Sequence, residues 1–414
     1  MKYLTLPLAV AIATSLVTSL AMGAAAPPPQ RQLGPPPGAG AGLEGSADTE
    51  EPAAKTDAAP VVPVPPPKAR QSNAPEVDTS TDRTRMLLGE VEILDVPLQE
   101  IPNHREHMRT MIEDLSIYAH GRNPKFVVVT EPGFDLTGWS RREFDLEEIK
   151  RDRTAKIAPD AIVPVGAPMR RYLQRIDGVL LNGQFCAPLR VPRVDLAAMM
   201  KQGVKMLSVD HCADAAQGSA ALQAAIRMGV VAHIDLDEND TFDRVPTRRP
   251  APENSGNVEV LADAKNMLMM LDSRGYPSRD EWIAAMAATN YDVLITDAFY
   301  RGNMPLSKSA IHSLKFKQMG ARRLVLARLS LGYAEDERYY WQRDWKIGAP
   351  SWIQARAPGK PGSYVVEFWN PAWKAIVGKY FAGIMDLGFD GVVLDGVEAY
   401  RRYEFMTPLD ATKG

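Results

Sequence analysis

The stretch YDVLITDAFYRGNMPLSKSAIHSLKFKQMGARRLVLARLSLGY, residues 291–333, contains two continuously apolar runs separated by an amphipathic segment. Short apolar runs of this kind are typical of strands that are covered on both faces. The segment between them, SKSAIHSLKFKQMG, has helical spacing and ends in glycine, as helix C-termini often do. The stretch therefore predicts a strand, a helix and a second strand in succession, which is the repeating unit of a parallel sheet.

The same alternation of apolar runs and helical patterns extends over the chain from about Met86 onward. The strand candidates are KFVVVTEPGF, IDGVLLNGQF, VKMLSVDHCAD, GVVAHIDLDE, YDVLITDAFY, RRLVLARLSLGY and FDGVVLDGVEAY. Further helical patterns are REHMRTMIEDLSIYAHG, SRDEWIAAMAATN and NPAWKAIVGKYFAGIMDLG. Such a series, with no glycine-rich phosphate loop after a strand, favours an α/β fold of the (β/α)8 TIM barrel type over a doubly wound sheet.

The N-terminal part of the chain has a different composition. Residues 1–24 combine Lys2, an apolar run and the small residues AMGAAA, a pattern that predicts a secretory signal peptide. A membrane anchor is the alternative, which the small-residue exit and the prolines after it disfavour. Residues 25–84 are rich in proline and alanine and predict a disordered linker, so residues 85–414 form the barrel domain. We expect a secreted or periplasmic protein with no stable membrane insertion after signal cleavage.

Charge and composition narrow the class of protein. The 414 residues carry a formal net charge of −3, which gives no basic field for nucleic acid, so we expect no nucleic-acid partner. Cys186 and Cys212 are too few for a disulfide framework, and we favour two small buried residues over a single bridge. His104 and His107 have no third ligand at metal spacing, so we expect no metal site. The sequence does not determine an oligomeric state.

Acidic residues recur where the strand candidates end. Because the strands of a parallel barrel all end at one mouth, these carboxylates are expected to converge. Crowding shifts carboxyl pKa values apart and provides the acid and base that glycoside hydrolysis requires. The alternative for any single residue is a helix N-cap. The residues are Glu131, Asp210, Asp235, Asp237, Asp297, Glu335, Asp395 and Glu398.

Aromatic residues accompany the last acidic segments. Aromatic rings can stack on the apolar faces of sugars, and their alternative role is to fill space between helices and barrel. Together with the carboxylates, they predict a sugar-binding cleft. The tryptophans concerned are Trp341, Trp345, Trp352, Trp369 and Trp373, with Tyr339, Tyr340 and Tyr364 among them.

Long stretches of the chain resemble the secreted endo-alpha-1,4-polygalactosaminidase family, glycoside hydrolase family 114. The resemblance extends from about His104 to Glu404 and implies a TIM barrel, no cofactor, and a galactosamine-containing polysaccharide as substrate. The stretches that carry it include residues 250–300, RRLVLARLSLGYAEDERYYW, GSYVVEFWNPAWKAIV, GFDGVVLDGVEAYRRYE and REHMRTMIEDLSIYAHGRNPKF.

The resemblance implies roles for single residues. Asp395 and Asp297 match acids at strand ends, and Glu335 matches the second acid of a motif whose first acid is replaced by Tyr333. These three acids are the predicted catalytic residues. Family motifs at two other strand ends are replaced by TEPG and LNGQFCAP. The predicted substrate-binding residues are Tyr333, Glu398, Tyr340, Trp341, Trp369, Tyr400, Asp210 and Glu131.

Three hypotheses on function remain open at this point. The first is a secreted glycosidase that acts on a polysaccharide with cationic amino sugars, which acidic strand ends would attract. The second, motivated by Tyr333, is a catalytically impaired glycan-binding barrel of the cell envelope. The third is a structural cell-envelope protein tethered by the proline-rich arm.

Overall fold

The protein divides into two units, Met1–Val64 and Pro65–Gly414. The computed structural model describes residues 91–151, 163–186, 191–236, 239 and 241–409, all within the second unit. The predicted signal peptide and linker lie outside the described residues.

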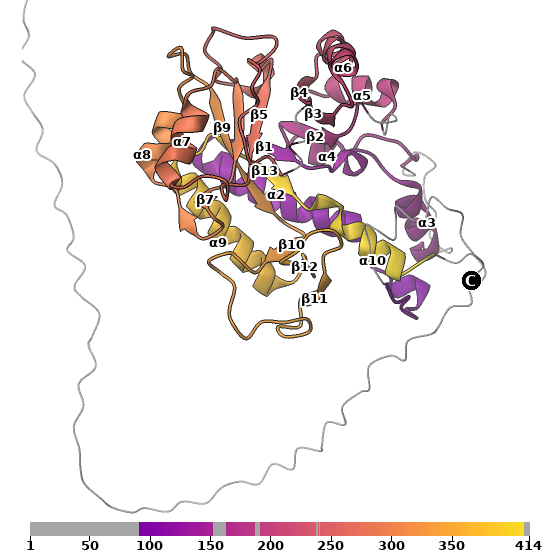
Figure 1. Ribbon diagram of the computed structural model, residues 1–414. Coiled ribbons are helices and arrows are strands. Elements are labelled where there is room, and N and C mark those ends of the chain that lie inside the picture. Colours follow the sequence, from indigo (N-terminus) through magenta and orange to yellow (C-terminus); the bar gives the residue numbers. More distant parts are fainter. Residues whose placement is uncertain (1–90, 152–162, 187–190, 237–238, 240, 410–414) are drawn as a thin grey trace, which may run out of the picture. The chain divides into compact units, whose positions relative to one another are not determined.

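Eight parallel strands form the centre of this unit (Figure 1). Around the sheet their order is β4-β3-β2-β1-β13-β9-β6-β5, and the two edge strands β4 and β5 contact each other, so the sheet nearly closes. The (β/α)8 barrel predicted from the sequence is confirmed. The strands are β1 Val127–Thr130, β2 Gly178–Asn182, β3 Lys205–His211, β4 Val231–Asp235, β5 Met267–Met270, β6 Val293–Thr296, β9 Leu324–Ser330 and β13 Gly391–Asp395.

Seven of these strands coincide with the strand candidates of the sequence, and the eighth, β5, was not among them. Its sequence is MLMM, four residues with no β-branched or aromatic side chain. Such a short apolar run does not distinguish a strand from a helix, because only its tertiary setting decides.

Both faces of the barrel strands are apolar, and the two faces alternate along each strand. On β1, Val127 and Val129 belong to the cluster inside the barrel, whereas Val128 belongs to the cluster between strands and helices. This period of two is the geometry of a strand. It fixes which residues at a strand end point into the barrel mouth.

Helices surround the barrel, and several begin at a side-chain N-cap that accepts a backbone N–H. Such caps are Asn103, Ser140, Asp214, Ser278, Ser307 and Asn370. The α-helices are α2 His104–Arg122, α3 Arg141–Lys150, α4 Arg170–Leu173, α5 Arg193–Met200, α6 Ala215–Met228, α7 Arg279–Ala287, α8 Lys308–Leu314, α9 Pro371–Leu387 and α10 Tyr400–Met406. The 3-10 helices are η1 Leu98–Glu100, η2 Phe134–Leu136, η4 Leu261–Asp263 and η5 Val397–Ala399. Within the described residues no helix is long and apolar enough to cross a membrane.

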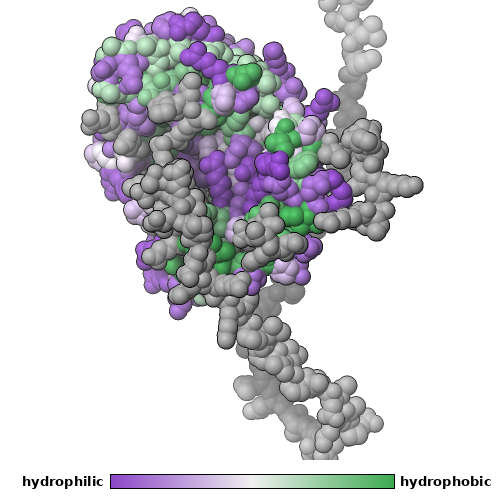
Figure 2. All heavy atoms as spheres, turned by 90° about the vertical axis from the view of Figure 1, so that its right-hand side faces the viewer, coloured by the Kyte–Doolittle hydropathy of each residue, from purple (hydrophilic) through white to green (hydrophobic). Residues whose placement is uncertain are grey.

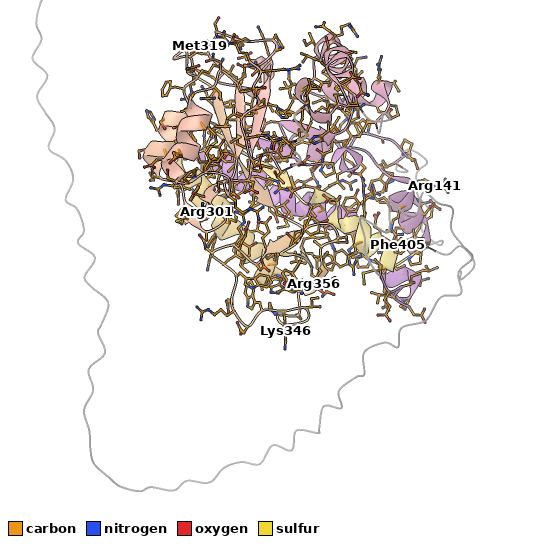
Figure 3. All side chains as sticks on the ribbon, in the orientation of Figure 1. Arg141, Arg301, Met319, Lys346, Arg356 and Phe405 are labelled. Carbon is orange, nitrogen blue, oxygen red and sulfur yellow. A yellow bond between two sulfur atoms is a disulfide. The ribbon has the colours of Figure 1, made fainter. Side chains whose placement is uncertain are left out.

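An insertion between β9 and α9 carries a three-stranded antiparallel sheet. Its strands are β10 Tyr333–Glu335, β12 Ser363–Val366 and β11 Ile353–Arg356, in that order. In Figure 3, Arg356 and Lys346 of this insertion lie at the opposite end of the barrel from Met319, which precedes β9. The insertion therefore lies at the mouth, where the strands end. A two-stranded hairpin, β7 Phe299–Tyr300 and β8 Met304–Pro305, follows β6.

Cys186 and Cys212 form a disulfide, with their Cα atoms 5.2 Å apart. The expectation of two unlinked buried cysteines is therefore wrong, and both residues are also only partly buried. The two cysteines follow β2 and β3, which are neighbours in the sheet. That neighbourhood brings them within bridging distance, and their spacing along the chain does not reveal it.

Candidate active site

The alternation along the strands aims four charged residues into the barrel mouth. Glu131 continues the inward-facing series of β1, as Asp395 does for β13, Asp297 for β6 and Arg328 for β9. Glu131 and Asp395 stand at the same level, because β1 and β13 pair in register and Glu131 N donates to Leu394 O at 2.7 Å. Neighbouring parallel strands lie about 4.8 Å apart, so the two carboxyl groups project side by side.

One guanidinium group faces both of these carboxyl groups. Arg328 Nη2 donates to Asp395 Oδ2, and Arg328 Nε lies 4.0 Å from Glu131 Oε2. Asn182, at the end of β2, donates to Glu131 Oε1 at 3.4 Å. Asp395 and Glu131 are both almost fully buried, so the arrangement is largely withdrawn from water.

The environments of the two carboxyl groups move their pKa values in opposite directions. Burial and the neighbouring charge of Asp395 raise the pKa of Glu131 to about 7. Burial acts in the same sense on Asp395, but attraction to Arg328 and Lys360 outweighs it and holds the pKa of Asp395 below its ordinary value. A pair with separated pKa values is the arrangement in which one carboxyl group serves as acid and the other as base or nucleophile.

A third carboxyl group and a lysine complete this side of the mouth. Lys360 Nζ lies 3.8 Å from Asp395 Oδ2 and 3.8 Å from Glu398 Oε1. Tyr333 Oη donates to Glu398 Oε1 at 3.1 Å. Burial raises the pKa of Tyr333, so its hydroxyl stays protonated and remains a donor. Burial and the charge of Asp395 also raise the pKa of Glu398.

A second guanidinium centre holds the other two predicted catalytic acids. Arg338 Nη1 donates to Asp297 Oδ2 at 2.7 Å and to Asp297 Oδ1 at 2.9 Å. Arg338 Nε donates to Glu335 Oε2. Burial raises the pKa of Asp297 although Arg338 opposes that shift. The structure thus sorts the acids into two groups, Glu131, Asp395 and Glu398 around Arg328 and Lys360, and Asp297 and Glu335 around Arg338.

Aromatic rings lie beside the second group. Tyr340 Oη accepts from Glu335 N at 3.0 Å, and its ring packs edge-on against Trp373. Phe299 and the half-exposed Tyr339 stack with ring centroids 5.3 Å apart. A cavity of about 10 Å³ has room for about one water, and is lined by residues that include Arg328, Ser330, Glu335, Arg338, Tyr340 and Tyr380.

Several buried polar atoms at the mouth have no hydrogen-bond partner among the described residues. Buried polar groups are normally satisfied, so such atoms indicate positions for water or a ligand. The unpartnered atoms are Glu131 Oε2, Arg328 Nε, Ser330 Oγ and Glu398 Oε2.

Figure 2 shows hydrophilic side chains gathered near the middle of one face of the molecule. No cluster able to hold a metal ion occurs in the part of the chain that the structure describes.

Comparison with known families bears directly on these residues. The segment 280–413, which includes Asp297, Arg328, Arg338 and Asp395, matches the family model described as glycoside-hydrolase family GH114. The matched segment is similar to this family and makes up less than half of the chain. The resemblance seen in the sequence is thereby confirmed for this segment.

Three relatives of the chain are described as uncharacterized proteins. A Deinococcus radiodurans protein is 33% identical over 120 residues, covering 29% of this chain and 37% of that protein. A Methanocaldococcus jannaschii protein is 32% identical over 149 residues, 36% of this chain and 41% of that protein. A Thermotoga maritima protein is 37% identical over 75 residues, 18% of this chain and 23% of that protein. The chain thus spans about two fifths or less of the relatives it matches.

Among solved structures, the glycoside hydrolase domain of PelA from Pseudomonas aeruginosa matches with 20% identity and a TM-score of 0.24. The match covers 34% of this chain and 51% of that chain. A variant of the same domain matches at 19% identity with a TM-score of 0.23. Likenesses of this size add nothing to the fold, which the sheet topology itself defines.

Four residues predicted to bind substrate lie outside both acidic groups of the candidate site. Asp210 follows the inward-facing Val209 on β3, so its side chain points away from the barrel interior. It accepts hydrogen bonds from the backbone N–H groups of Phe185 and Cys186. Tyr400 is fully buried and donates to Asp135. Trp369 packs on His104 and Tyr403, and Trp341 stacks on Tyr364.

Asp235, another acid of the sequence prediction, is the last residue of β4. Asp235 accepts from the backbone N–H of Asn239 and lies 2.8 Å from His211 Nδ1. Asp237 lies outside the described residues.

The sequence prediction missed the basic residues of the candidate site. Arg328, Arg338 and Lys360 contact its carboxyl groups, whereas the sequence prediction rested on acidic and aromatic residues. The alternation along β9 was the signal that could have found Arg328, because this residue lies two positions after the inward-facing Leu326 and so shares its face. Lys360 gave no such signal, since the turn that carries it reaches the mouth only in the folded chain.

Proposed function

We propose that this protein is a secreted glycoside hydrolase that cleaves a galactosamine-containing or related extracellular polysaccharide, without a cofactor. The observation that carries the proposal is the pair Glu131 and Asp395, which stand side by side in a GH114 barrel with pKa values moved apart. Glycoside hydrolysis requires one carboxyl group that donates a proton and one that is ionised.

Asp395 is the ionised member of the pair. Its side chain contacts Arg328 and Lys360, and η5 after it has Gly396 at its N-cap with no side-chain cap bond. The helix-cap role considered for this acid therefore has no support. An ionised carboxylate here stabilises the positive charge that develops at the anomeric carbon, as nucleophile or as the base for a water.

Glu131 is the proton donor. A carboxyl group with a pKa of about 7 is largely protonated below neutral pH and can give its proton to the departing glycosidic oxygen. The bond between that oxygen and the anomeric carbon breaks, and water supplies the hydroxyl of the new reducing end. This assignment moves Glu131 from the predicted binding residues to the reacting pair.

Asp297 and Glu335 are proposed to hold the sugar through Arg338 and not to react. Arg338 binds both oxygens of Asp297 and also binds Glu335, which neutralises much of their charge. The stacked rings of Phe299 and Tyr339 beside them offer an apolar surface for the C–H face of a sugar.

The alternative function is a catalytically impaired, glycan-binding barrel of the cell envelope. Tyr333 favours it, because this residue stands where the family motif has an acid and donates to Glu398 instead. The deciding experiment incubates the purified protein with acetylated and deacetylated galactosamine polymers. Release of reducing ends that is lost in Glu131→Gln and Asp395→Asn supports hydrolysis. Binding without release of reducing ends supports the alternative.

A further inference from the structure

The ammonium group of Lys360 occupies a space bounded by two carboxyl groups and one aromatic ring. Its Nζ atom lies 3.8 Å from Asp395 Oδ2, 3.8 Å from Glu398 Oε1 and 4.4 Å from the centroid of the Tyr333 ring. Carboxylates and the face of an aromatic ring are the groups that attract an ammonium ion. The chain therefore places its own cation where the ammonium of an amino sugar would otherwise be attracted.

The turn that presents Lys360 is held by backbone hydrogen bonds. Between β11 and β12, Ala357 N donates to Ser363 O at 2.8 Å, and Ser363 N donates to Lys360 O at 3.1 Å. Asp336 N donates to Gly362 O at 2.8 Å, which ties the turn to the segment after β10. The backbone of Lys360 is thus fixed over the mouth, while its side chain remains 39% exposed to solvent.

The ammonium protons of Lys360 remain available to a ligand. Both 3.8 Å contacts are too long for hydrogen bonds, and the described residues offer this group no hydrogen bond. Beside it, the buried Glu398 Oε2 has no partner within the described residues. The site thus offers a cationic donor and an anionic acceptor next to Asp395.

We propose that Lys360 determines substrate specificity: the subsite beside Asp395 accepts an N-acetylated hexosamine and excludes one with a free ammonium group. This inference rests on the proposed function. The acetamido carbonyl oxygen accepts a hydrogen bond from Lys360, and the acetamido N–H is a donor for Glu398.

Electrostatics explains the exclusion. An ammonium on the substrate would have to share the space beside Asp395 and Glu398 with that of Lys360. Two like charges a few ångströms apart repel strongly in a partly buried site. A binding site that discriminates by such a repulsive element loses its selectivity when the element is removed. The acidic mouth predicted to attract cationic sugars is therefore offset at this position by the chain's own lysine.

The experiment compares two series of α-1,4-linked galactosamine oligosaccharides, one N-acetylated and one deacetylated, at about pH 6, where a primary amine is protonated. For the wild-type protein we expect kcat/KM to be higher with the acetylated series. Lys360→Met should reduce that ratio on the order of 10-fold or more, mainly by improving the deacetylated series. Lys360→Arg should keep it, and Lys346→Met, an exposed lysine of the same insertion, serves as the charge-matched control.

Salt provides a second readout. Raising the ionic strength should weaken the exclusion of the deacetylated series in the wild-type protein and change little in Lys360→Met.

A wild-type preference for the deacetylated series would overturn the inference while leaving hydrolysis intact. So would a ratio of kcat/KM between the two series that Lys360→Met leaves unchanged. If neither series is cleaved, the proposed hydrolysis fails, and calorimetric binding of the same oligosaccharides still tests the preference. Absence of binding by both series overturns both proposals.

Discussion

Glu131 and Asp395 project side by side from two hydrogen-bonded strands, and the same guanidinium group of Arg328 faces both. In this arrangement burial raises the proton affinity of Glu131, and the charge of Asp395 adds to that effect. Asp395 contacts Arg328 and stays ionised, and its negative charge helps burial to raise the pKa of Glu131 to about 7. The pair is therefore coupled, and a change in either residue is expected to appear in the titration of the other.

Asp395→Asn tests the ionised member of the pair. We expect turnover to fall roughly 10²–10⁴-fold, the usual scale for a positioned acid or base. The melting temperature should change little, because asparagine keeps the size and an acceptor for Arg328. Turnover and melting are measured on the same variant. Full turnover with a lowered melting temperature would remove Asp395 from the reacting pair.

The pKa of Glu131 in Asp395→Asn is a separate observable. Removing the charge of Asp395 removes a cause that raises the pKa of Glu131, so that pKa should fall below about 7. Carboxyl chemical shifts followed by NMR across a pH titration report the change. An unchanged pKa would show that burial alone raises it.

Glu131→Gln tests the proposed proton donor through the pH dependence of activity. Because the donor must be protonated, wild-type kcat/KM should decline as pH rises through about 7. The variant should lose that decline together with most of its activity on a natural glycosidic bond. Activity on an aryl glycoside should survive better, because that leaving group departs without a proton. Equal losses on both substrates would argue that Glu131 only binds.

The same variant predicts a pH dependence of stability. Between about pH 4.5 and pH 7 folded Glu131 retains a proton that the unfolded chain releases, so the wild-type free energy of unfolding falls as pH rises through this window. A shift of this size corresponds to about 3 kcal/mol. Urea unfolding at several pH values should show Glu131→Gln gaining on the wild type by up to that amount. A constant difference would contradict the raised pKa.

The disulfide between Cys186 and Cys212 predicts a dependence on redox conditions. It spans 26 positions, and closing a loop of that length restricts the unfolded chain by about 3 kcal/mol. Reduction, or replacement of both cysteines by serine, should lower the free energy of unfolding by about that amount. The doubly substituted protein should in addition be insensitive to reductant, and a response there would point to another cause.

The fold followed from the sequence because apolar runs and helical spacing are local patterns. The strand β5 was not predicted, because the four residues MLMM do not favour a strand over a helix. Its place between β6 and β4 comes from the tertiary contacts alone. The disulfide escaped for the same reason, since the pairing of β2 with β3 brings its cysteines together.

The candidate site was only partly predictable. The local sequence shows that Asp395, Asp297 and Glu131 lie at strand ends. The alternation of strand residues between the two faces of the sheet distinguishes these inward-facing acids from Asp210. Which acids share a guanidinium depends on how strands pair and where the insertion after β9 folds back. Lys360 in particular reaches Asp395 from a turn far from any barrel strand in sequence.

The ion pair of Lys317 and Asp292 lies at the barrel end opposite the mouth. Lys317 Nζ lies 2.7 Å from Asp292 Oδ1, and both side chains are fully buried. Lys317 also donates to Asn254 O at 2.7 Å and Gly256 O at 2.8 Å. Lys317→Met leaves a buried carboxylate without its cation, so the free energy of unfolding should fall by about 3–5 kcal/mol.

The exposed pair of Lys125 and Glu259 is the control, where Lys125→Met should lower the free energy of unfolding by at most about 1 kcal/mol. Denaturant unfolding of both variants measures the contrast, while turnover by folded Lys317→Met should stay near that of the wild type because the mouth is untouched. An equal loss of unfolding free energy in the two variants would show that water reaches Asp292, and that this end of the barrel is less well shielded from solvent than the contacts of Lys317 indicate.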